Sequence, residues 1–418
     1  MKITKNTLTT LRNTCLGLSF AALTGSAQAV DLEVTHWWTS GGEAAAVAEF
    51  AKALNENTEH NWVDGAIAGS GGTARPIMIS RILGGDPMAA TQFNHGRQTE
   101  ELIDAGLMLD LTDVAEAEGW KDVVNPTSLL DSCTYDGKIY CVPVNIHSWQ
   151  WIWLSHQAYK DAGVEVPSNW DEFVAAAPAL QKAGKVPLAL GGQSWQSSGA
   201  FGVLAIAIAG MDAWSAVNVD KSAETAAGPE YKKVFEAAVA ARELAKGSNV
   251  QDWNQATNLV ITGKAGGQIM GDWAQGEFQV AGQVAGEDYT CLPGLGVNEV
   301  ISTGGDAFYF PKLKDPAMES AQKELAALMM SKEVQVNFNL KKGSLPVRGD
   351  VNLEAANDCM KKGLEILAGG NILPDVNQVF SSDTADQIND LMVEFWASDD
   401  VSAEDAQSRY AEIIADAD

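Results

Sequence analysis

Short apolar runs alternate with segments of helical periodicity along most of the chain. The strand-like runs are residues 32–38, 62–69, 89–93, 185–192 and 265–273. The helical patterns between them are residues 43–55, 73–83, 99–105 and 197–210. This order predicts an α/β fold with mostly parallel sheets. From about residue 316 onward the pattern predicts mainly acidic helices.

The first 29 residues differ from the rest in pattern. Lys2, Lys5 and Arg12 precede a short apolar core at residues 15–23, and Ala-Gln-Ala follows at 27–29. A positive start, a short apolar core and small residues before a cleavage point are typical of a secretory signal peptide. The apolar core is too short to span a bilayer. We therefore expect an exported, periplasmic protein that does not insert into the membrane.

The size and charge of the chain narrow the possible functions. Removing the three basic residues of the leader takes the formal net charge from −27 to −30. Such an acidic surface argues against nucleic acid or an anionic membrane as partner, and it also keeps an abundant exported protein soluble. The mature length exceeds what one hydrophobic core normally supports, so we expect two domains.

Four cysteines remain after the leader, namely Cys133, Cys141, Cys291 and Cys359. An even number in an oxidising compartment predicts two disulfides, with three possible connectivities, and four unpaired thiols are the alternative. Residues 133–141 form a hairpin pattern, in which a three-residue turn at 136–138 would place Cys133 opposite Cys141 and leave Cys291 with Cys359. No cysteine or histidine spacing fits a zinc site, so no metal is expected.

Tryptophans stand at the ends of several predicted strands. Trp37 and Trp38 end the first strand, and Trp195 and Trp273 repeat this position beside glycine, glutamine and aspartate. Ligands of open α/β sheets bind beyond the carboxyl ends of strands. An indole face packs against the apolar face of a pyranose ring, and amides and carboxylates bind its hydroxyls. The pattern therefore predicts a carbohydrate site.

Some of these residues also have structural interpretations. Ser40 and Glu43 fit a capping box, with Glu43 reaching back to the start of the helix. Trp149, Trp151 and Trp153 alternate along one strand face and are expected in the core. Asp272 fits a helix cap as well as a sugar contact, whereas Gln193 and Trp195 are expected to line the cleft. The glycine-rich stretch at 69–73 could form an anion-binding turn before a helix.

Six motifs in order resemble one family. They are "HWWTSGGE", "YDGKIYCVPVNIHS", "GGQSWQ", "MGDW", "GGDAF" and "KKGSLPVR". Together they resemble the family-1 extracellular solute-binding proteins of ABC importers, particularly the periplasmic glucose-binding branch. The resemblance implies a type II-like periplasmic binding protein fold, with two α/β lobes, a hinge and the ligand between them. It places residues 30–146 and 303–345 in one lobe, and 147–302 and 346–418 in the other.

The resemblance also implies roles for residues that match its motifs. Trp37 and Trp38 correspond to a sugar-stacking pair, Glu43 and Asp306 to hydroxyl acceptors, and Lys342 to a donor. Trp273 corresponds to the opposing aromatic wall. Relatives often have lysine or histidine just after "ATQ", where this chain has Gln92, Phe93, Asn94 and His95, so Asn94 or His95 takes that role. A family histidine is missing near residue 378, where Asn377 or Gln378 replaces it.

The expected function is binding without chemistry or cofactor. A monomer would capture a monosaccharide, glucose or a similar aldohexose, and deliver it to the permease subunits of an ABC importer at the inner membrane. An oligosaccharide or a polyol is the main alternative ligand. A secreted glycosidase with Glu43 and Asp306 as paired carboxylates, and a sugar-phosphate receptor using residues 69–73, are further alternatives.

Overall fold

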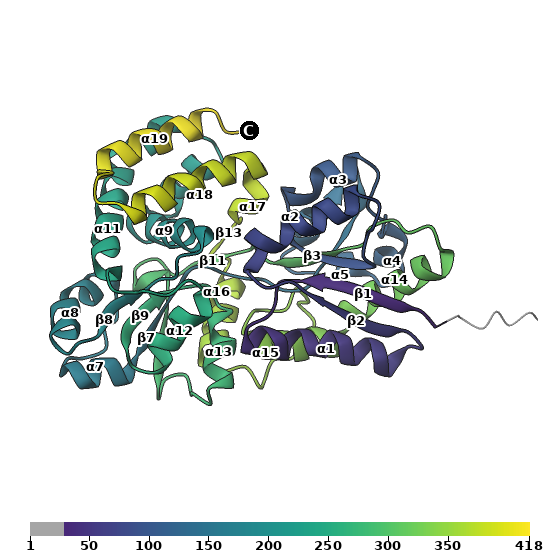
Figure 1. The fold of residues 1–418 in the computed structure, drawn as a ribbon, viewed down its shortest axis with the longest axis horizontal. Helices are drawn as coiled ribbons and strands as arrows, with labels where there is room; N and C mark the ends of the chain where they lie inside the picture. Colours follow the sequence, from purple (N-terminus) through teal and green to yellow (C-terminus); the bar gives the residue numbers. More distant parts are fainter. Residues whose placement is uncertain (1–28) are drawn as a thin grey trace, which may run out of the picture.

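The protein is described here by a computed structural model that covers residues 29–418. Two α/β lobes lie side by side, with the N-terminal part of the chain in one and most of the middle and the C-terminal helices in the other (Figure 1). The predicted two-lobed α/β fold is therefore confirmed. The signal peptide expected over residues 1–29 lies, apart from Ala29, outside the described residues and stays a prediction.

The first lobe is built on a five-stranded sheet with the order β2-β1-β3-β12-β6. Its strands are β1 (Asp31–His36), β2 (Asn61–Ala66), β3 (Ala90–Asn94), β6 (Cys141–Pro143) and β12 (Asp306–Tyr309). β1 pairs in parallel with β2 and β3, whereas β12 pairs antiparallel with β3 and β6. Four of the five strands therefore run in one direction, as predicted for a mostly parallel sheet, and β12 alone, between β3 and β6, runs against them.

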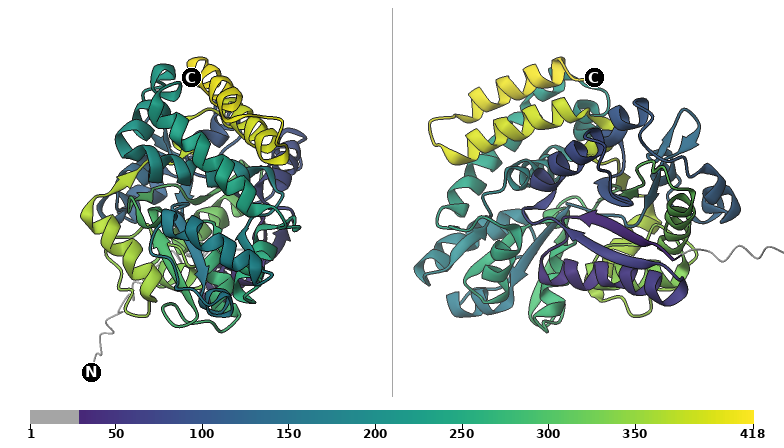
Figure 2. Two further views of the ribbon diagram at one scale, coloured as in Figure 1. Left: turned by 90° about the vertical axis from the view of Figure 1, so that its left-hand side faces the viewer. Right: turned by 45° about the vertical axis from the view of Figure 1, so that its right-hand side comes forward.

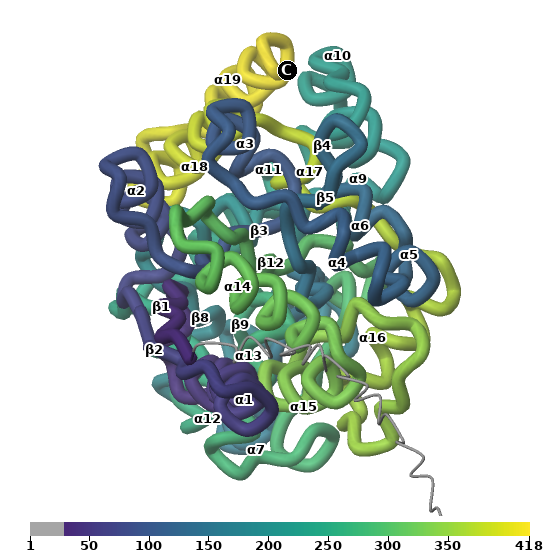
Figure 3. The backbone as a smooth tube through the Cα atoms, turned by 90° about the vertical axis from the view of Figure 1, so that its right-hand side faces the viewer, coloured from purple at the N-terminus to yellow at the C-terminus, as the bar shows by residue number. Residues whose placement is uncertain are grey.

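Helices cover both faces of this sheet (Figures 1 and 3). On one face lie α1 (Gly41–Asn57), α14 (Pro316–Met329) and α15 (Lys332–Lys342), and on the other lie α2 (Ser70–Leu83) and α3 (Glu100–Asp104). The short helices α4 (Thr112–Ala117), α5 (Trp120–Val123) and α6 (Ser128–Asp131) follow. In α1 the buried residues Ala46, Phe50, Ala53 and Leu54 recur at helical spacing, so one stripe of the helix packs on the sheet.

The second lobe has a four-stranded sheet with the order β10-β7-β9-β8. The strands are β7 (Trp151–Ser155), β8 (Val186–Ala189), β9 (Ala265–Ile269) and β10 (Tyr289–Pro293). Only the β8–β9 pair is parallel. The surrounding helices are α7 (His156–Ala162), α8 (Trp170–Lys182), α9 (Ser194–Asn218), α10 (Ala223–Ala226), α11 (Pro229–Ala245), α12 (Trp253–Ile261), α13 (Ala274–Val280), α16 (Asp358–Gly369), α17 (Val376–Val379), α18 (Ser382–Ala397) and α19 (Ala403–Ala415). Figure 2 shows α18 and α19 as the outer layer of this lobe.

Helix α9 is the core helix of the second lobe. By length and composition it is apolar enough to cross a membrane. Its apolar side chains instead pack against α11 and α18, and Gly210, with φ of 85°, breaks the helical geometry near its end. This packing accounts for its apolar character.

The chain passes between the lobes more than once. Isolated bridges join Ile146 to Leu345 and His147 to Gly304, so crossing segments far apart in sequence lie next to one another. The first-lobe sheet takes strands from residues 31–143 and 306–309, both within the segments predicted for that lobe. The lobe limits at 146, 302 and 345 stay predictions.

Both predicted disulfides are present. Cys133 pairs with Cys141 and Cys291 with Cys359, with Cα–Cα distances of 5.1 and 6.0 Å. The predicted three-residue turn is wrong, because Asp136 and Gly137 alone, both with positive φ, connect β4 (Thr134–Tyr135) to β5 (Lys138–Ile139). The Tyr140 amide donates to the carbonyl of Cys133, so Tyr140, not Cys141, lies opposite Cys133. The disulfide therefore joins Cys133 to the residue that follows its directly opposed partner.

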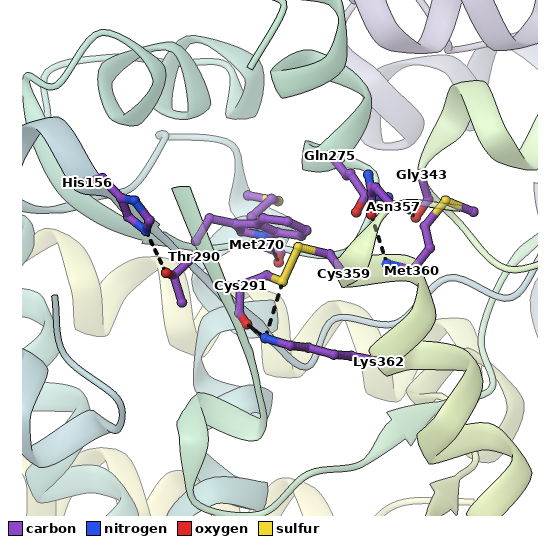
Figure 4. Close-up of a disulfide and its surroundings, with 11 residues drawn as sticks. His156, Met270, Gln275, Thr290, Cys291, Gly343, Asn357, Cys359, Met360 and Lys362 are labelled. Carbon is purple, nitrogen blue, oxygen red and sulfur yellow. Dashed lines mark hydrogen bonds between the residues drawn. A yellow bond between two sulfur atoms is a disulfide. The ribbon is translucent and has the colours of Figure 1, made fainter. Parts of the chain in front are cut away.

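The Cys291–Cys359 disulfide connects the second-lobe sheet to α16 (Figure 4). Cys291 lies in β10, and Cys359 in the first turn of α16. Lys362 Nζ donates to the carbonyl oxygen of Cys291 at 3.0 Å, a second link between the same two elements. Helix α16 is thereby fixed to the sheet.

Candidate functional site

A cavity of about 240 Å³ lies between the two lobes. The first lobe lines it with the residues after β1, the first turns of α1 and α2, the start of β12 and the end of α15. The second lobe contributes parts of α9, α17 and α18 and five tryptophans, namely Trp149, Trp195, Trp214, Trp253 and Trp273. The cavity thus collects strand ends and helix ends from both lobes, as predicted for a ligand site of an α/β protein.

The two neighbouring tryptophans after β1 have different environments. Trp37 is half-buried and lines the cavity. Trp38 touches the cavity, but only 1% of it is exposed, because its ring packs in a cluster with Phe50, Phe308 and Phe338. Successive residues of an extended chain point to opposite sides, which separates the pair. The expectation of two free stacking faces is therefore wrong for Trp38, and Trp37 is the stacking candidate of this lobe.

Glu43 and Lys342 form a buried ion pair in the cavity wall. Glu43 comes from the first turn of α1 and Lys342 from the last turn of α15, and Lys342 Nζ lies 2.9 Å from Glu43 Oε1. Ser40 Oγ accepts from the Glu43 amide, as a helix cap does, and donates to Glu43 Oε2 at 3.1 Å. Glu43 therefore binds the capping hydroxyl instead of reaching back to the backbone, and its other oxygen serves Lys342.

His147 connects carboxylates of the two lobes. Its Nε2 lies 2.6 Å from Asp306 Oδ2 in β12, and its Nδ1 lies 2.8 Å from Asp272 Oδ1 just after β9. Burial lowers the pKa of His147, but the charges of Asp306 and Asp272 outweigh it and raise that pKa overall. Burial also opposes ionisation of Asp306, yet His147 and then Lys342 lower the pKa of Asp306 to about 2. The opposite charges of His147 and Asp306 thus stabilise one another within the wall.

Three tryptophans form the second-lobe wall. The ring centroid of Trp149 lies 5.4 Å from that of Trp195 and 4.9 Å from that of Trp273, both in edge-to-face contact. The prediction that Trp149 shares a core face with Trp151 and Trp153 is wrong, because Trp149 precedes β7 and lines the cavity. Trp151 and Trp153 are buried in the core as predicted.

Several predicted polar residues lie behind the cavity wall. Gln92 is fully buried and donates to Asp306 Oδ1 at 2.7 Å, so it positions that carboxylate. His95 is also fully buried, contacts Ser132 and Gln378, and burial lowers its pKa to about 4. Of the two alternatives after β3, Asn94 lines the cavity and His95 does not.

Of the other predicted site residues, some line the cavity and some lie behind its wall. Asn377 lines the cavity, whereas Gln378 donates to the carbonyl of Thr303, so Asn377 is the residue in reach of a ligand. Gln193 donates to Ser70 Oγ and Asp252, and Asp272 accepts from His147 and the Ser148 amide. Neither Gln193 nor Asp272 lines the cavity, because these partners hold both side chains within the protein.

The lobes touch one another around the cavity. Trp195 Nε1 of the second lobe donates to Ser70 Oγ at the start of α2, at 2.9 Å. Glu277 of α13 accepts from the Gly42 amide at 2.7 Å, where Gly42 and Gly276 pack backbone to backbone. The structure therefore represents a closed arrangement of the lobes.

Sequence reasoning missed many of the residues that line the cavity, including Arg75 and Asp375. Arg75 and Ser70 come from α2, and Asp375 caps α17 with a carboxylate whose pKa is raised by burial. The glycine-rich stretch at 69–73 was a signal for this helix start, but Arg75 has no motif of its own. Within residues 29–418 no group of three or more histidine, cysteine, aspartate or glutamate side chains could hold a metal ion.

Comparison with known proteins identifies the family. The sequence profile "Bacterial extracellular solute-binding protein" matches residues 38–334. A "Probable sugar-binding periplasmic protein" of Rhizobium meliloti is 34% identical over 363 residues, covering 86% of each chain. Two solved structures share the fold. One is a "Chitin oligosaccharide binding protein", with a TM-score of 0.76 and 19% identity over 93% of this chain and 99% of that one. The other is the bacterial solute receptor AcbH, described as having a substrate preference for β-D-galactopyranose, with a TM-score of 0.73 and 20% identity over 93% of this chain and 98% of that one. The chain therefore belongs to the bacterial extracellular solute-binding proteins.

Proposed function

We propose that this protein is the periplasmic sugar-binding component of an ABC importer and that it binds one pyranose ring, glucose or a similar aldohexose, as a monomer. The observation that carries the proposal is the small closed cavity that combines indole faces with paired charges. Its volume of about 240 Å³ lies below the roughly 300–1,000 Å³ common for drug-sized ligands, which favours one ring over a longer saccharide. The name of the Rhizobium meliloti relative supports sugar as the ligand class.

The binding mode follows from the cavity walls. One face of the ring would stack on Trp37, and Trp273 would close over it from the second lobe. Glu43, Asp306 and Lys342 would bind the hydroxyls through charge-assisted hydrogen bonds. A micromolar dissociation constant requires about 8 kcal/mol, which two aromatic contacts and several such bonds can supply in a closed site.

Closure would couple binding to transport. A ligand shifts the equilibrium between open and closed lobes only if it binds the closed form better. Here both lobes supply cavity residues, so the full set of contacts exists only when the lobes are closed. The permease subunits would then receive the closed, loaded form.

Titration calorimetry with glucose, mannose, galactose and xylose, and with maltose and a chitin disaccharide, tests the proposal. We expect at least one monosaccharide to bind with a micromolar or lower dissociation constant. Binding of the disaccharides alone would refute the single-ring assignment. Absence of measurable binding for all six sugars would refute sugar binding by this cavity.

Asp306 and Glu43, the carboxylate pair of the glycosidase alternative, do not have the environments that its mechanism requires. Such enzymes need one carboxylic acid with a raised pKa beside a second carboxylate. The pKa of Asp306 is instead lowered to about 2, and Glu43 is paired with Lys342. Release of nitrophenol from aryl glycosides would be the contrary result.

A further inference from the structure

Arg75 brings a positive charge into the cavity. It lies in α2, lines the cavity, and its guanidinium carbon lies 5.7 Å from the ring centroid of Trp37. Its one hydrogen bond within the described chain runs from Nη1 to Asn94 Oδ1 and is long, at 3.4 Å. No carboxylate of residues 29–418 lies within 4.0 Å of its nitrogens. The carboxylate of Asp386 on α18 influences it from beyond ion-pair distance, and burial lowers the Arg75 pKa.

The other cations of the cavity wall already have partners. Lys342 lies 2.9 Å from Glu43, and His147 lies 2.6 Å from Asp306. The remaining lining carboxylate, Asp375, accepts from the backbone and side-chain amides of Asn377. An arginine stays charged in proteins, and holding a charge away from water without a partner is unfavourable. Within the described chain, the cavity therefore presents a half-buried cation that has no counter-charge at ion-pair distance.

The start of α2 leaves space for a ligand beside this guanidinium. Ser70, Gly71 and Gly72 line the cavity. A Cβ atom at position 71 would lie 2.6 Å from Arg75 Nη1, so the guanidinium rests against this turn only because residue 71 is glycine. At Gly72 a Cβ atom would meet nothing within 4 Å. The glycine-rich stretch at 69–73 thus gives the arginine its position.

We propose that Arg75 binds the carboxylate of an acidic monosaccharide, a hexuronate, within the cavity. The inference rests on the proposed function, because the pyranose ring would occupy the place described above. A planar guanidinium matches a carboxylate in bidentate geometry. In a hexuronate the carboxylate is attached directly to the ring, and Arg75 lies beside the indole on which that ring would stack. The bound acid would supply the missing counter-charge.

The test compares sugars that differ only in this group. Calorimetry would measure galactose against galacturonate and glucose against glucuronate, together with glucose 6-phosphate, on the full-length mature protein. We expect a uronate to bind at least 10-fold tighter than its neutral partner, and this preference to weaken with rising salt. Replacement of Arg75 by methionine should lower the ratio of uronate affinity to neutral-sugar affinity by about 10- to 100-fold.

Two further variants separate the causes. Arg81→Met on the same helix removes an arginine paired with Glu33, at 2.6 Å, outside the cavity, and it should leave the preference unchanged. Asp386→Asn should also leave the preference for the uronate unchanged. If Asp386→Asn instead weakened the binding of all sugars strongly, Arg75 would act with Asp386 as a contact that closes the lobes, and the inference would be overturned. Thermal melting would confirm that each variant folds.

The outcomes distinguish the inference from the proposed function. Equal or tighter binding of the neutral sugar, or tightest binding of glucose 6-phosphate, would overturn the hexuronate assignment and leave sugar binding intact. An Arg75→Met variant that loses neutral and acidic sugars alike would also overturn it. Failure of every sugar to bind would remove the proposed function, and the inference with it.

Discussion

Removal of the Lys342 ammonium should strongly destabilise the first lobe. Lys342 is 2% exposed, and its Nζ lies 2.9 Å from Glu43 Oε1. At an effective dielectric constant of about 20, a charge pair at this distance is worth about 6 kcal/mol. The Lys342→Met variant leaves the Glu43 carboxylate buried, with only the Ser40 hydroxyl and the helix start to stabilise it, and helix termini contribute up to about 2 kcal/mol. We therefore expect the free energy of unfolding to fall by about 3–5 kcal/mol.

Urea unfolding followed by tryptophan fluorescence would measure this loss. Lys341→Met is the matched control, because Lys341 is the exposed neighbour on the same helix and should change stability by less than about 0.5 kcal/mol. The double variant Lys342→Met, Glu43→Gln removes both charges. It should recover much of the lost free energy of unfolding, since no unpaired carboxylate is then left buried. A free energy of unfolding for Lys342→Met within about 1 kcal/mol of the wild-type value would refute this reasoning, because breaking a buried ion pair by removing one partner costs more than that.

Three further predictions follow from the cavity walls. Trp37→Ala and Trp273→Ala should each weaken sugar binding about 10- to 100-fold by calorimetry, whereas Trp38→Ala should mainly lower stability, by about 3–5 kcal/mol in urea, as for other buried aromatics. The folded-state pKa of His147 is raised above 6.5, so the stabilisation by its charge is complete below pH 6.5 and is lost as pH rises through the raised pKa. Melting temperatures measured from pH 5 to 9 should therefore decline with rising pH, and His147→Gln should remove this decline. Gly199→Ala would place a Cβ atom 2.4 Å from the Trp149 ring and should weaken sugar binding. The control Gly369→Ala, at the exposed end of α16 and outside the cavity, meets nothing within 4 Å and should not change it. Equal calorimetric affinities for the two variants would contradict the role of Trp149.

The sequence predicted the α/β alternation because strand and helix periodicities are local properties. It also predicted both disulfides, since Cys133 and Cys141 belong to one hairpin and only Cys291 and Cys359 remain. The reversed direction of β12 was not predicted, because it depends on where the chain crosses back from the other lobe. That crossing brings residues distant in sequence side by side and leaves no local periodic signal.

Prediction of the site was limited by side-chain direction. Trp38 and Trp149 exchanged the expected roles of wall and core, because one belongs to an aromatic cluster with Phe338 and the other lies before its strand begins. Gln92 and His95 are one layer behind the cavity, where they hold Asp306 and Gln378. Arg75 was missed, since a single arginine within a helix gives no sequence signal for an unpaired charge.

The covalent link from β10 to α16 also bears on how the lobes move. Helix α16 is the first long helix after the chain leaves the first lobe for the last time, and Cys359 sits at its start. Anchored there, the segment that carries the return crossing ends at a fixed point on the second-lobe sheet. Bending of this last crossing segment is thereby confined to the stretch before residue 358, and an oxidising environment would keep α16 moving together with the second-lobe sheet.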